Sequence, residues 1–468
     1  MRLTASFTGS RGVRYPAPDV ARGFMLLLIA GANVSVWPTI ANPDSTGGEA
    51  AAGAGGMADV ADTVWVWVRT LLISDRVYPL FAMLFGFGLV TMINRRIESG
   101  TNSYLRGLDG ARAGREPTPA EISWAHERAT VDARRLVRRR GLWMILFGLV
   151  HGVFFYGDII GTYGLAAVVF AGWLARKHRR RAIAVSVLLI LWLIWTQLNT
   201  GGTAAIMGTT YAQAVAQEQM PATGLLVFAS NVRHWAMNTV LTLTSSTIVP
   251  AMFIGARLAD TDVMADPRGH RRPLTVVALG GLIIGAVSAV GMARWITGGR
   301  LMFWDLAVAE VFGLAGGCGW LALLALYAGG PRPDGRLTGL KWLLAAVGRR
   351  SMTAYLSQTV MFGTMFAVMP RLTGNPLELG AAASAAVAVM VWLVTVGVCA
   401  GLERLGEPGP FEALLRTAVV SGERSRVMPA MPPNPRHSAR SLAQPERVQA
   451  PIALADNKAA GRHLLAGV

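Results

Sequence analysis

Apolar residues fall in long blocks along this chain, and short polar segments separate the blocks. Each block runs roughly 17 to 25 residues, the length that an α-helix needs to cross the hydrocarbon core of a bilayer. The pattern predicts an all-α fold, a polytopic membrane bundle of about ten transmembrane helices. The predicted spans are Val20–Trp37, Val77–Ile93, Gly141–Tyr156, Ile159–Leu174, Ala182–Leu198, Met237–Leu258, Leu274–Ile296, Phe303–Leu326, Thr353–Met369 and Leu379–Leu402.

The segments between the blocks alternate between cation-rich and cation-poor. Residues 94–140 hold eleven arginines, whereas residues 38–62 hold no lysine or arginine and four acidic residues. Because cytoplasmic connections carry the excess of lysine and arginine, the alternation places both termini in the cytoplasm. It also predicts a multi-pass protein of the plasma membrane.

Three regions lie outside or beside the predicted spans. Residues 1–19 form a cytoplasmic N-terminal segment ahead of the transmembrane domain at 20–420, and the proline-rich residues 421–468 are typical of a disordered cytoplasmic tail. The Gly/Ala-rich stretch 42–56 resembles a flexible external loop. Residues 58–74 fit an amphipathic helix at the outer interface and an extension of the second span equally well.

Composition supports a membrane protein over a nucleic-acid binder. Hydrophobic residues make up 53% of the chain and charged residues 15%, whereas soluble proteins have about 25% charged residues. The net charge of +17 comes from cations that flank the apolar blocks, where they contact anionic lipid headgroups. Cys318 and Cys399 stand far apart inside apolar blocks, and we interpret them as small core residues, with no metal site.

Ionisable residues inside the apolar blocks are candidates for chemistry, because burying them in a bilayer costs free energy. His151 lies roughly 15 Å along its predicted span, and Asp158 follows two helical turns later, roughly 10 Å further along a straight helix. At that separation the pair needs a bridging substrate, a water or another span, unless the turn at Gly157 folds the carboxylate back. The alternative is structural: the histidine bonds a backbone carbonyl and the aspartate caps the next helix.

Other polar residues fall at a similar depth. Asn33 lies toward the outer side of the first span, Arg76 lies at the outer mouth of the second, and Asp305 and Glu310 lie in the outer half of the eighth. Their common depth permits them to converge with His151 into one polar layer. An ion pair between Glu310 and Arg76 is the structural alternative.

A second group of candidates lies at the cytoplasmic end. Asp19 and Arg22 open the first span, and Arg349 and Arg350 precede the ninth. Arginines there can hold phosphate with two parallel hydrogen bonds, or can anchor the helices at the interface. In the ninth span, Ser351, Tyr355 and Gln358 form one polar stripe at helical spacing. The glycine pairs 281/285 and 313/317 have the spacing of close helix contacts.

Several motifs resemble the YeiB-like membrane proteins, which carry domain-of-unknown-function family 418. The resemblance covers residues 15–420, and the motifs are jointly fairly specific. The matching residues are Asp19-Val-Ala-Arg22-Gly23-Phe24 with Asn33, Leu84-Phe85-Gly86-Phe87-Gly88, His151 with Gly157-Asp158-Ile159 and Tyr163, Gly348-Arg349 with Thr353, Tyr355 and Gln358, and Gly409-Pro410-Phe411-Glu412 with Leu415 and Arg416.

The resemblance implies a fold more than a reaction, because no activity is established for that family. Its opening motif is also similar to that of membrane acyltransferases, including acyltransferase family 3 and the heparan-alpha-glucosaminide N-acetyltransferase group. Those enzymes take acyl groups from cytoplasmic acyl-coenzyme A and modify sugars or lipids. Their first span commonly supplies a histidine where this chain has Asn33, so the resemblance leaves His151 as the base.

These observations lead to one hypothesis and two alternatives. The hypothesis is acyl transfer to a sugar or lipid acceptor, with acyl-coenzyme A as a transient co-substrate and no permanently bound cofactor. The alternatives are a transporter or channel for a small metabolite and a non-catalytic membrane partner; the bilayer is a partner in every case. The hypothesis makes His151 and Asp158 catalytic, assigns coenzyme binding to Arg22 and Arg349, and assigns substrate binding to Asn33, Tyr163, Glu310, Tyr355 and Gln358.

Overall fold

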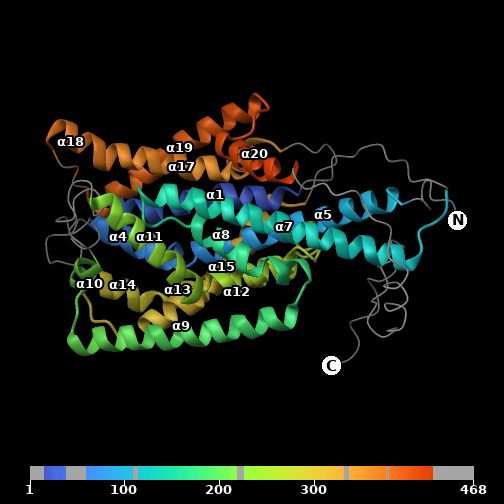
Figure 1. The fold of residues 1–468 in the computed structure, drawn as a ribbon. Helices are drawn as coiled ribbons and strands as arrows, with labels where there is room; N and C mark the ends of the chain where they lie inside the picture. Colours follow the sequence, from blue (N-terminus) through green and yellow to red (C-terminus); the bar gives the residue numbers. More distant parts are fainter. Residues whose placement is uncertain are drawn as a thin grey trace. The chain divides into compact units, whose positions relative to one another are not determined.

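The computed structural model describes residues 15–37, 60–108, 114–218, 226–330, 337–375, 377 and 379–424. Every regular element in these ranges is helical, which confirms the predicted all-α fold (Figure 1). The predicted loop at 42–56, most of the N-terminal segment and the tail beyond residue 424 lie outside the described residues.

The first half of the chain contains ten helical elements within the described residues. The break between α11 and α12 bends the chain by 60°. The elements are α1 (Pro16–Asn33), η1 (Val34–Val36), α4 (Val60–Leu72), α5 (Val77–Arg106), α7 (Pro119–Gly152), α8 (Ile160–Ala175), α9 (Arg179–Met207), α10 (Tyr211–Glu218), α11 (Leu226–Thr244) and α12 (Ile248–Leu258).

The second half continues in the same way. A short π-helical segment, η2, follows α17 and interrupts the ninth predicted span. The elements are α13 (Arg271–Ser288), α14 (Val290–Ile296), α15 (Asp305–Ala328), α16 (Gly339–Arg349), α17 (Ser351–Gly363), η2 (Thr364–Val368), α18 (Met369–Thr373), α19 (Ala381–Arg404) and α20 (Pro410–Arg424).

The chain divides into two compact units, residues 1–95 with 133–427 and residues 96–132 with 428–468. In the smaller unit, the end of α5 faces the start of α7. The Tyr104 hydroxyl donates a 2.5 Å hydrogen bond to the Asp132 carboxylate. The Tyr104 ring also packs edge-on against Trp124 with centroids 5.7 Å apart. These contacts hold the two facing helix ends together, although most residues of those ends are polar.

The predicted spans all coincide with helices or broken helix pairs, but the count of about ten is not confirmed. Within the described residues, six helices are long and apolar enough to cross a membrane, or seven if the bent α11–α12 pair is one span. The other predicted spans fall short for physical reasons. In α7 the apolar part follows a run of arginines, α8 has 16 residues, and the 13 residues of α17 include the polar stripe.

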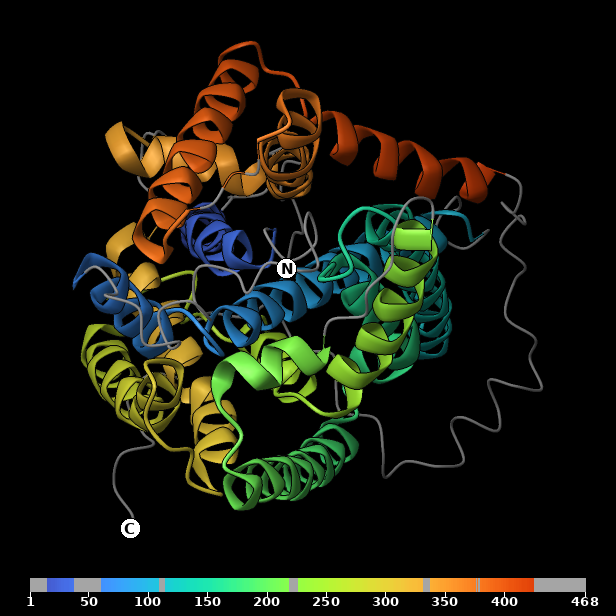
Figure 2. The same cartoon turned by 90° about the vertical axis from the view of Figure 1, so that its left-hand side faces the viewer.

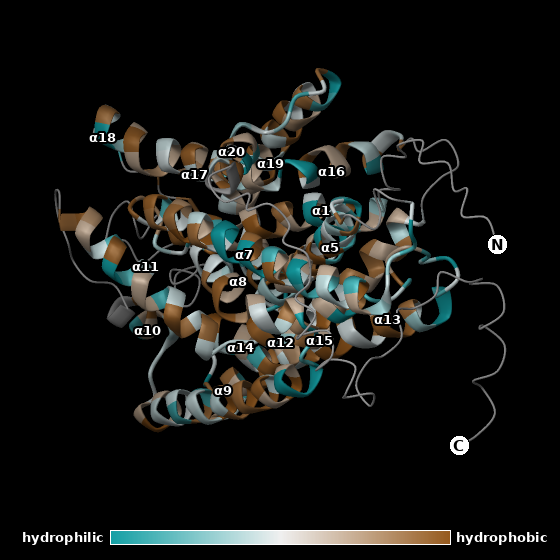
Figure 3. Ribbon diagram, turned by 45° about the vertical axis from the view of Figure 1, so that its right-hand side comes forward, coloured by the Kyte–Doolittle hydropathy of each residue, from teal (hydrophilic) through white to brown (hydrophobic). Residues whose placement is uncertain are grey.

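Exposed apolar stripes show which helix faces suit a lipid environment. On α13, Val276, Leu279, Ile283 and Val287 repeat at helical spacing and are 60–71% exposed. In α9 only 6% of the most apolar window is buried, and hydrophobic colouring covers much of this helix (Figure 3). Because water disfavours such continuous apolar surfaces, we conclude that the bundle is a membrane protein.

The N-terminal helix α1 packs against α15, α16, α17 and α19. Figure 2, which looks along many of the helices, shows α1 with α17 and α19 on its upper side. Two glycines let α1 and α16 approach closely. A Cβ atom at Gly23 would collide with the carbonyl of Leu344, and one at Gly348 would collide with the carbonyl of Asp19. Both glycines belong to the motifs that carry the family resemblance.

The two glycine pairs predicted to mediate packing lie at helix contacts. An added Cβ at Gly285 would lie 2.8 Å from the Cα of Gly316, which joins α13 to α15. Gly313 and Gly317 face the backbone at the start of α5 instead. The small residues therefore bring three helices together, as such spacings do in other membrane bundles.

The segment 58–74 forms the separate helix α4 from residue 60, and a turn joins it to α5. It packs against α13, α14 and α19. The Asp62 carboxylate accepts a 2.8 Å hydrogen bond from the backbone N–H of Ala382 and so caps the start of α19. Val60, Val64 and Val68 are exposed along the opposite face. The segment is helical, as both alternatives predicted, and α4 and α5 together make up one candidate membrane span, residues Val60–Arg106.

Candidate functional site

His151 lies at the end of α7, and Asp158 follows in the turn that leads to α8. The helix ends at Gly152, so the straight-helix geometry no longer applies. The Nδ1 atom of His151 lies 2.7 Å from Asp158 Oδ1, and its Nε2 atom lies 2.8 Å from Thr359 Oγ1. Of the arrangements considered from the sequence, the one found is the turn that folds the carboxylate back.

The second carboxylate oxygen of Asp158 fixes the turn. It accepts a 2.8 Å hydrogen bond from the backbone N–H of Gly161 and a 3.1 Å hydrogen bond from Trp235 Nε1. Asp158 therefore caps the first turn of α8 and contacts the imidazole at the same time. The predicted cap of α8 is found together with the direct contact to His151, and the catalytic role of Asp158 stays a prediction.

Three glycines make room for this arrangement. A Cβ atom at Gly148 would lie 2.6 Å from Asp158 Oδ2, and Cβ atoms at Gly152 and Gly161 would lie 2.5 and 2.6 Å from the Trp235 indole. Gly152 on α7 and Gly161 on α8 thus form a slot for the indole ring of Trp235 on α11, and Gly148 leaves room for the Asp158 carboxylate. Side chains at any of them would move the donor that Trp235 presents to the carboxylate.

Aromatic rings surround the imidazole. The Tyr355 ring stands edge-on to His151 with centroids 5.2 Å apart, and the Phe155 ring lies at 5.7 Å. His151, Asp158 and Thr359 are 5–8% exposed. The buried Tyr355 hydroxyl lies near the backbone of Ile159, but within the described chain it makes no hydrogen bond of normal geometry. Tyr355 therefore offers an unused polar group beside the imidazole.

Two other predicted site residues have their polar groups bound to backbone carbonyls. The Tyr163 hydroxyl donates to the carbonyl of Tyr78 at 3.0 Å. The amide of Gln358 donates to the carbonyl of Leu26 at 3.4 Å. These bonds join α8 to α5 and α17 to α1. These hydrogen bonds give both side chains a role in packing, and their predicted role in substrate binding stays a prediction.

Asn33 ends α1 and is half-buried. Among the described residues, no hydrogen bond joins its amide to His151. The following residues approach the site instead, because Trp37 stacks on Phe155 at 5.3 Å and tilts against Phe362 at 6.3 Å. The first span thus contributes an aromatic wall.

Arg76 and Glu310 belong to a separate buried cluster. The Arg76 side chain is 1% exposed and donates to the carbonyls of Ser74 and Gly285. Asp75 lies 3.9 Å from its guanidinium. Glu310 interacts electrostatically with Asp75 and Arg76 and lies near the backbone of Thr247. In the described residues no hydrogen bond or ion pair joins this cluster to His151, so the predicted polar layer consists of two groups.

Asp305 has a structural contact. Its Oδ2 atom accepts a 2.8 Å hydrogen bond from the backbone N–H of Met302, beside the start of α15. The side chain also fills the space next to Gly291 on α14. Asp305 therefore fastens the turn that precedes α15 and packs against a neighbour.

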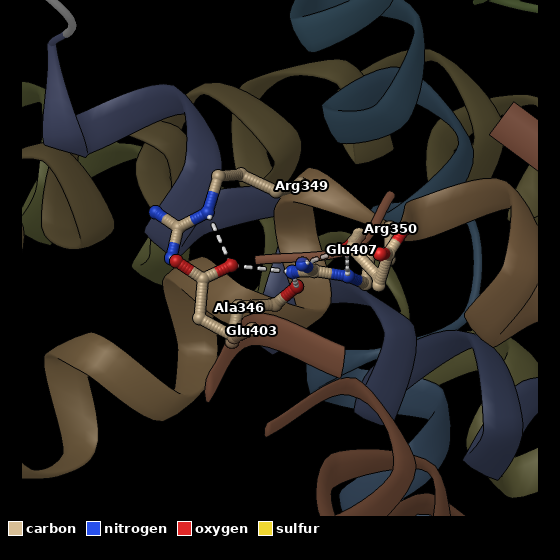
Figure 4. A network of polar contacts seen from close by, with 5 residues as sticks. All are labelled: Ala346, Arg349, Arg350, Glu403 and Glu407. Carbon is tan, nitrogen blue, oxygen red and sulfur yellow. Dashed lines mark hydrogen bonds and ion pairs between the residues drawn. The ribbon is translucent and has the colours of Figure 1, made fainter. Parts of the chain in front are cut away.

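The arginines before the ninth span share one carboxylate (Figure 4). Arg349 Nη2 lies 2.5 Å from Glu403 Oε1, and Arg349 Nε donates to Oε2 at 3.1 Å. Arg350 Nη1 lies 2.5 Å from the same Oε2, and its other donors bind the backbone of Glu407 and Ala346. A phosphate at Arg349 would have to compete with Glu403, which already occupies the fork of the guanidinium.

Arg22 lies between α1 and α5. Its Nη2 atom donates to the carbonyl of Leu84 at 3.0 Å, and Asp19 lies 3.5 Å from Nη1. A Cβ at Gly88 would lie 2.7 Å from Nη2, so that glycine leaves room for the guanidinium. The opening motif and the phenylalanine–glycine motif are therefore two halves of one contact.

The closing motif caps the ninth span. Glu412 on α20 accepts hydrogen bonds from the backbone N–H groups of Met352 and Thr353 at 2.7 and 3.1 Å. Its other oxygen accepts one from the Thr353 hydroxyl at 2.5 Å. A carboxylate at a helix N-terminus satisfies donors that have no partner within the helix. The threonine and glutamate of the two motifs are thus explained by one cap.

Sequence reasoning missed Thr359, Trp235 and Glu403. Thr359 follows Tyr355 by four residues, so an extension of the predicted polar stripe would have included it. Trp235 and Glu403 carry no such local signal, because their partners are distant in sequence.

Comparison with known proteins finds one family model that matches about a third of the chain. Residues 258–421 match the model of a protein family of unknown function, DUF418. This match confirms the predicted family, and it runs from the end of α12 into α20. Thr359, Glu403 and Glu412 lie within the matched residues, whereas His151 and Asp158 precede them. No curated protein and no solved structure matches the chain.

Proposed function

We propose that this membrane protein of the DUF418 family transfers an acyl group from acyl-coenzyme A to a hydroxyl of a sugar or lipid at the plasma membrane. The observation that supports the proposal best is the hydrogen-bonded series Asp158–His151–Thr359. A carboxylate, an imidazole and a hydroxyl in that order is an arrangement that activates a hydroxyl for attack.

The proposed roles follow from the two ring nitrogens. Asp158 keeps the proton on Nδ1 and stabilises the imidazolium when it forms. Nε2 then takes the proton of the acceptor hydroxyl as the oxygen attacks the thioester carbonyl. The carbon–sulfur bond breaks, and the coenzyme A thiolate takes the proton from Nε2. The Thr359 hydroxyl stands at 2.8 Å from Nε2 and marks a position from which a hydroxyl can give up its proton.

Substrate contacts are assigned on the same basis. Tyr355 is the best placed of the predicted substrate-binding residues, since its ring lies beside the imidazole and its buried hydroxyl makes no hydrogen bond of normal geometry within the described residues. It would donate a hydrogen bond to the acceptor or to the thioester carbonyl. The predicted contacts of Arg22 and Arg349 with the coenzyme phosphates belong to this proposal as well.

The test is acyl transfer by purified protein in lipid nanodiscs with labelled acyl-coenzyme A and extracts of membrane lipids and glycans. We expect the wild type to label one extracted component. His151→Ala should lower the rate about 10²- to 10⁴-fold, the usual contribution of a general base. His270→Ala, which changes an accessible histidine at the start of α13, is the matched control. Unchanged labelling in His151→Ala would contradict the assignment.

A transporter is the second candidate, and one observation favours it. The α11–α12 pair is bent by 60°, and it supplies Trp235 to Asp158 and the Thr247 backbone to Glu310. Broken helices beside buried ionisable groups are typical of transporter binding sites. Uptake of metabolites into sealed vesicles that depends on His151, without labelling by acyl-coenzyme A, would favour transport over acyl transfer.

A further inference from the structure

One face of α5 holds two arginines from other helices. Leu84, Gly88 and Met92 follow each other at four-residue spacing and therefore lie on one face. Arg22 from α1 donates to the Leu84 carbonyl and lies against Gly88. Arg140 from α7 places Nη1 4.0 Å from the Met92 sulfur. The two guanidinium groups thus lie against the same face of α5.

Arg140 is poorly satisfied in this position. Its Nε atom is buried and has no hydrogen-bond partner within the described chain. Its contact with a thioether sulfur is a weak one. Electrostatically it is repelled by Arg22 and Arg416 and attracted by Glu412. A half-buried guanidinium whose Nε atom lacks a hydrogen-bond acceptor is costly to maintain.

The neighbouring helix α20 brings a third arginine and a carboxylate whose lone pairs are engaged. Arg416 follows Glu412 by one helical turn, so both lie on the same face of α20. Glu412 accepts three hydrogen bonds from Met352 and Thr353 at the start of α17. Its negative charge is thus largely committed to that helix terminus. Asp19 in turn lies beside Arg22.

We infer that Arg22, Arg140 and Arg416 form a binding site for a phosphate group. We call these three residues the arginine cluster. A phosphate accepts several hydrogen bonds and carries the negative charge that the cluster lacks. Arg349 differs, because Glu403 already fills its fork. The phosphate can belong to coenzyme A or to the headgroup of an anionic phospholipid; only in the first case does the inference rest on the proposed acyl transfer.

The experiment measures two probes on the full chain purified in an uncharged detergent. Coenzyme A binding is followed by calorimetry, and retention of phosphatidylglycerol is followed by native mass spectrometry. We expect one of the probes to bind the wild type. Arg140→Gln and Arg416→Gln should each weaken that binding at least about tenfold, because each removes charge-assisted hydrogen bonds. Arg138→Gln removes the same charge from an exposed position on α7 and should bind as the wild type does.

The outcomes separate this inference from the proposed reaction. His151→Ala should bind the probe normally, so a failure of acyl transfer leaves the cluster testable. Arg416 is exposed, so we expect Arg416→Gln to fold as the wild type does, and weaker binding by this variant then reports the lost contact. Arg140→Lys keeps the charge but loses the planar fork, and we expect intermediate binding. Absence of binding by both probes, or equal binding by the Arg138 and Arg416 variants, overturns the inference.

Discussion

At the scale of single residues, the imidazole of His151 has both nitrogens engaged in a buried environment. One partner is the turn immediately after its own helix, and the other is Thr359, 208 positions further along the chain. A buried imidazole that loses a partner is left with an unsatisfied polar atom. The end of α7 and the helix α17, which are distant in sequence, are therefore joined by a bond that has a measurable free energy.

Thr359→Val should lower the free energy of unfolding by about 1–3 kcal/mol, because the isosteric side chain leaves Nε2 of His151 without a partner. Thr359→Ser restores the hydroxyl and should behave nearly as the wild type does. Thr364→Val is the matched control, since the Thr364 hydroxyl is exposed and bonds only its own helix at Val360. Thermal unfolding in detergent measures the three variants, and equal losses at 359 and 364 would contradict the assigned bond.

The sequence was sufficient to propose His151, Asp158 and Tyr355, because a titratable or polar side chain in an apolar block is conspicuous. It could not supply Thr359 or Trp235, since threonine and tryptophan are ordinary in such blocks. The direct contact of His151 with Asp158 depended on where α7 ends, and helix ends are poorly determined by hydrophobic periodicity. The roles of Arg22 and Arg349 look alike in the sequence, and only the position of Glu403 separates them.

At the scale of elements, glycines decide which helices touch. Gly348→Ala should be strongly destabilising, because the added methyl group collides with the Asp19 carbonyl and forces α16 away from α1. We expect a loss of about 2–4 kcal/mol, as for other disruptions of a packed core. Gly397→Ala in α19 is the control, since open space surrounds that position and alanine favours a helix by about 0.5–1 kcal/mol. A lower unfolding temperature for Gly397→Ala than for Gly348→Ala would contradict the close contact of α16 with α1.

The start of α7 has a reciprocal cap that responds to pH. Arg115 and the Thr118 backbone lower the pKa of Glu121 from 4.5 to about 2. Glu121 accepts from the Thr118 N–H at 2.8 Å, and its own N–H donates to the Thr118 hydroxyl at 3.3 Å. Because the folded pKa is depressed, the cap should stabilise the helix start fully above about pH 4.5 and be lost as pH falls toward 2.

Carboxyl chemical shifts of Glu121 measure this titration directly. The midpoint should move upward toward 4.5 in Arg115→Gln, because the hydrogen bond from Arg115, the largest cause of the lowered pKa, is removed. Arg128→Gln changes an exposed arginine on the same helix and serves as the control. A midpoint that is equal in both variants would show that the ion pair does not form.

At the scale of the whole molecule, the composition was enough to identify a helical membrane protein. Hydrophobic blocks predicted where helices occur, and α1, α8, α15 and α19 begin or end within a few residues of the expected positions. The predicted count of about ten spans is not confirmed, because among the described helices α8 and α17 are shorter than a helix that crosses a bilayer by itself. Breaks inside the blocks at Ala289 and after Thr244 follow from packing that periodicity does not record.

The predicted orientation can be tested with single cysteines after Cys318 and Cys399 are replaced by alanine. A membrane-impermeant maleimide should label Arg300→Cys in intact cells, because the link between α14 and α15 is predicted to be external. Arg180→Cys should be labelled only after the cells are opened, because its cation-rich segment is predicted to be cytoplasmic. Equal labelling of both in intact cells would contradict the orientation.

The double duty of Asp158 has a consequence for genetics. Any replacement of this carboxylate disturbs the imidazole and also frees the backbone N–H of Gly161. Substitutions at position 158 should therefore reduce activity and correct folding at the same time. A screen for inactive protein that still accumulates at normal abundance should therefore leave codon 158 untouched.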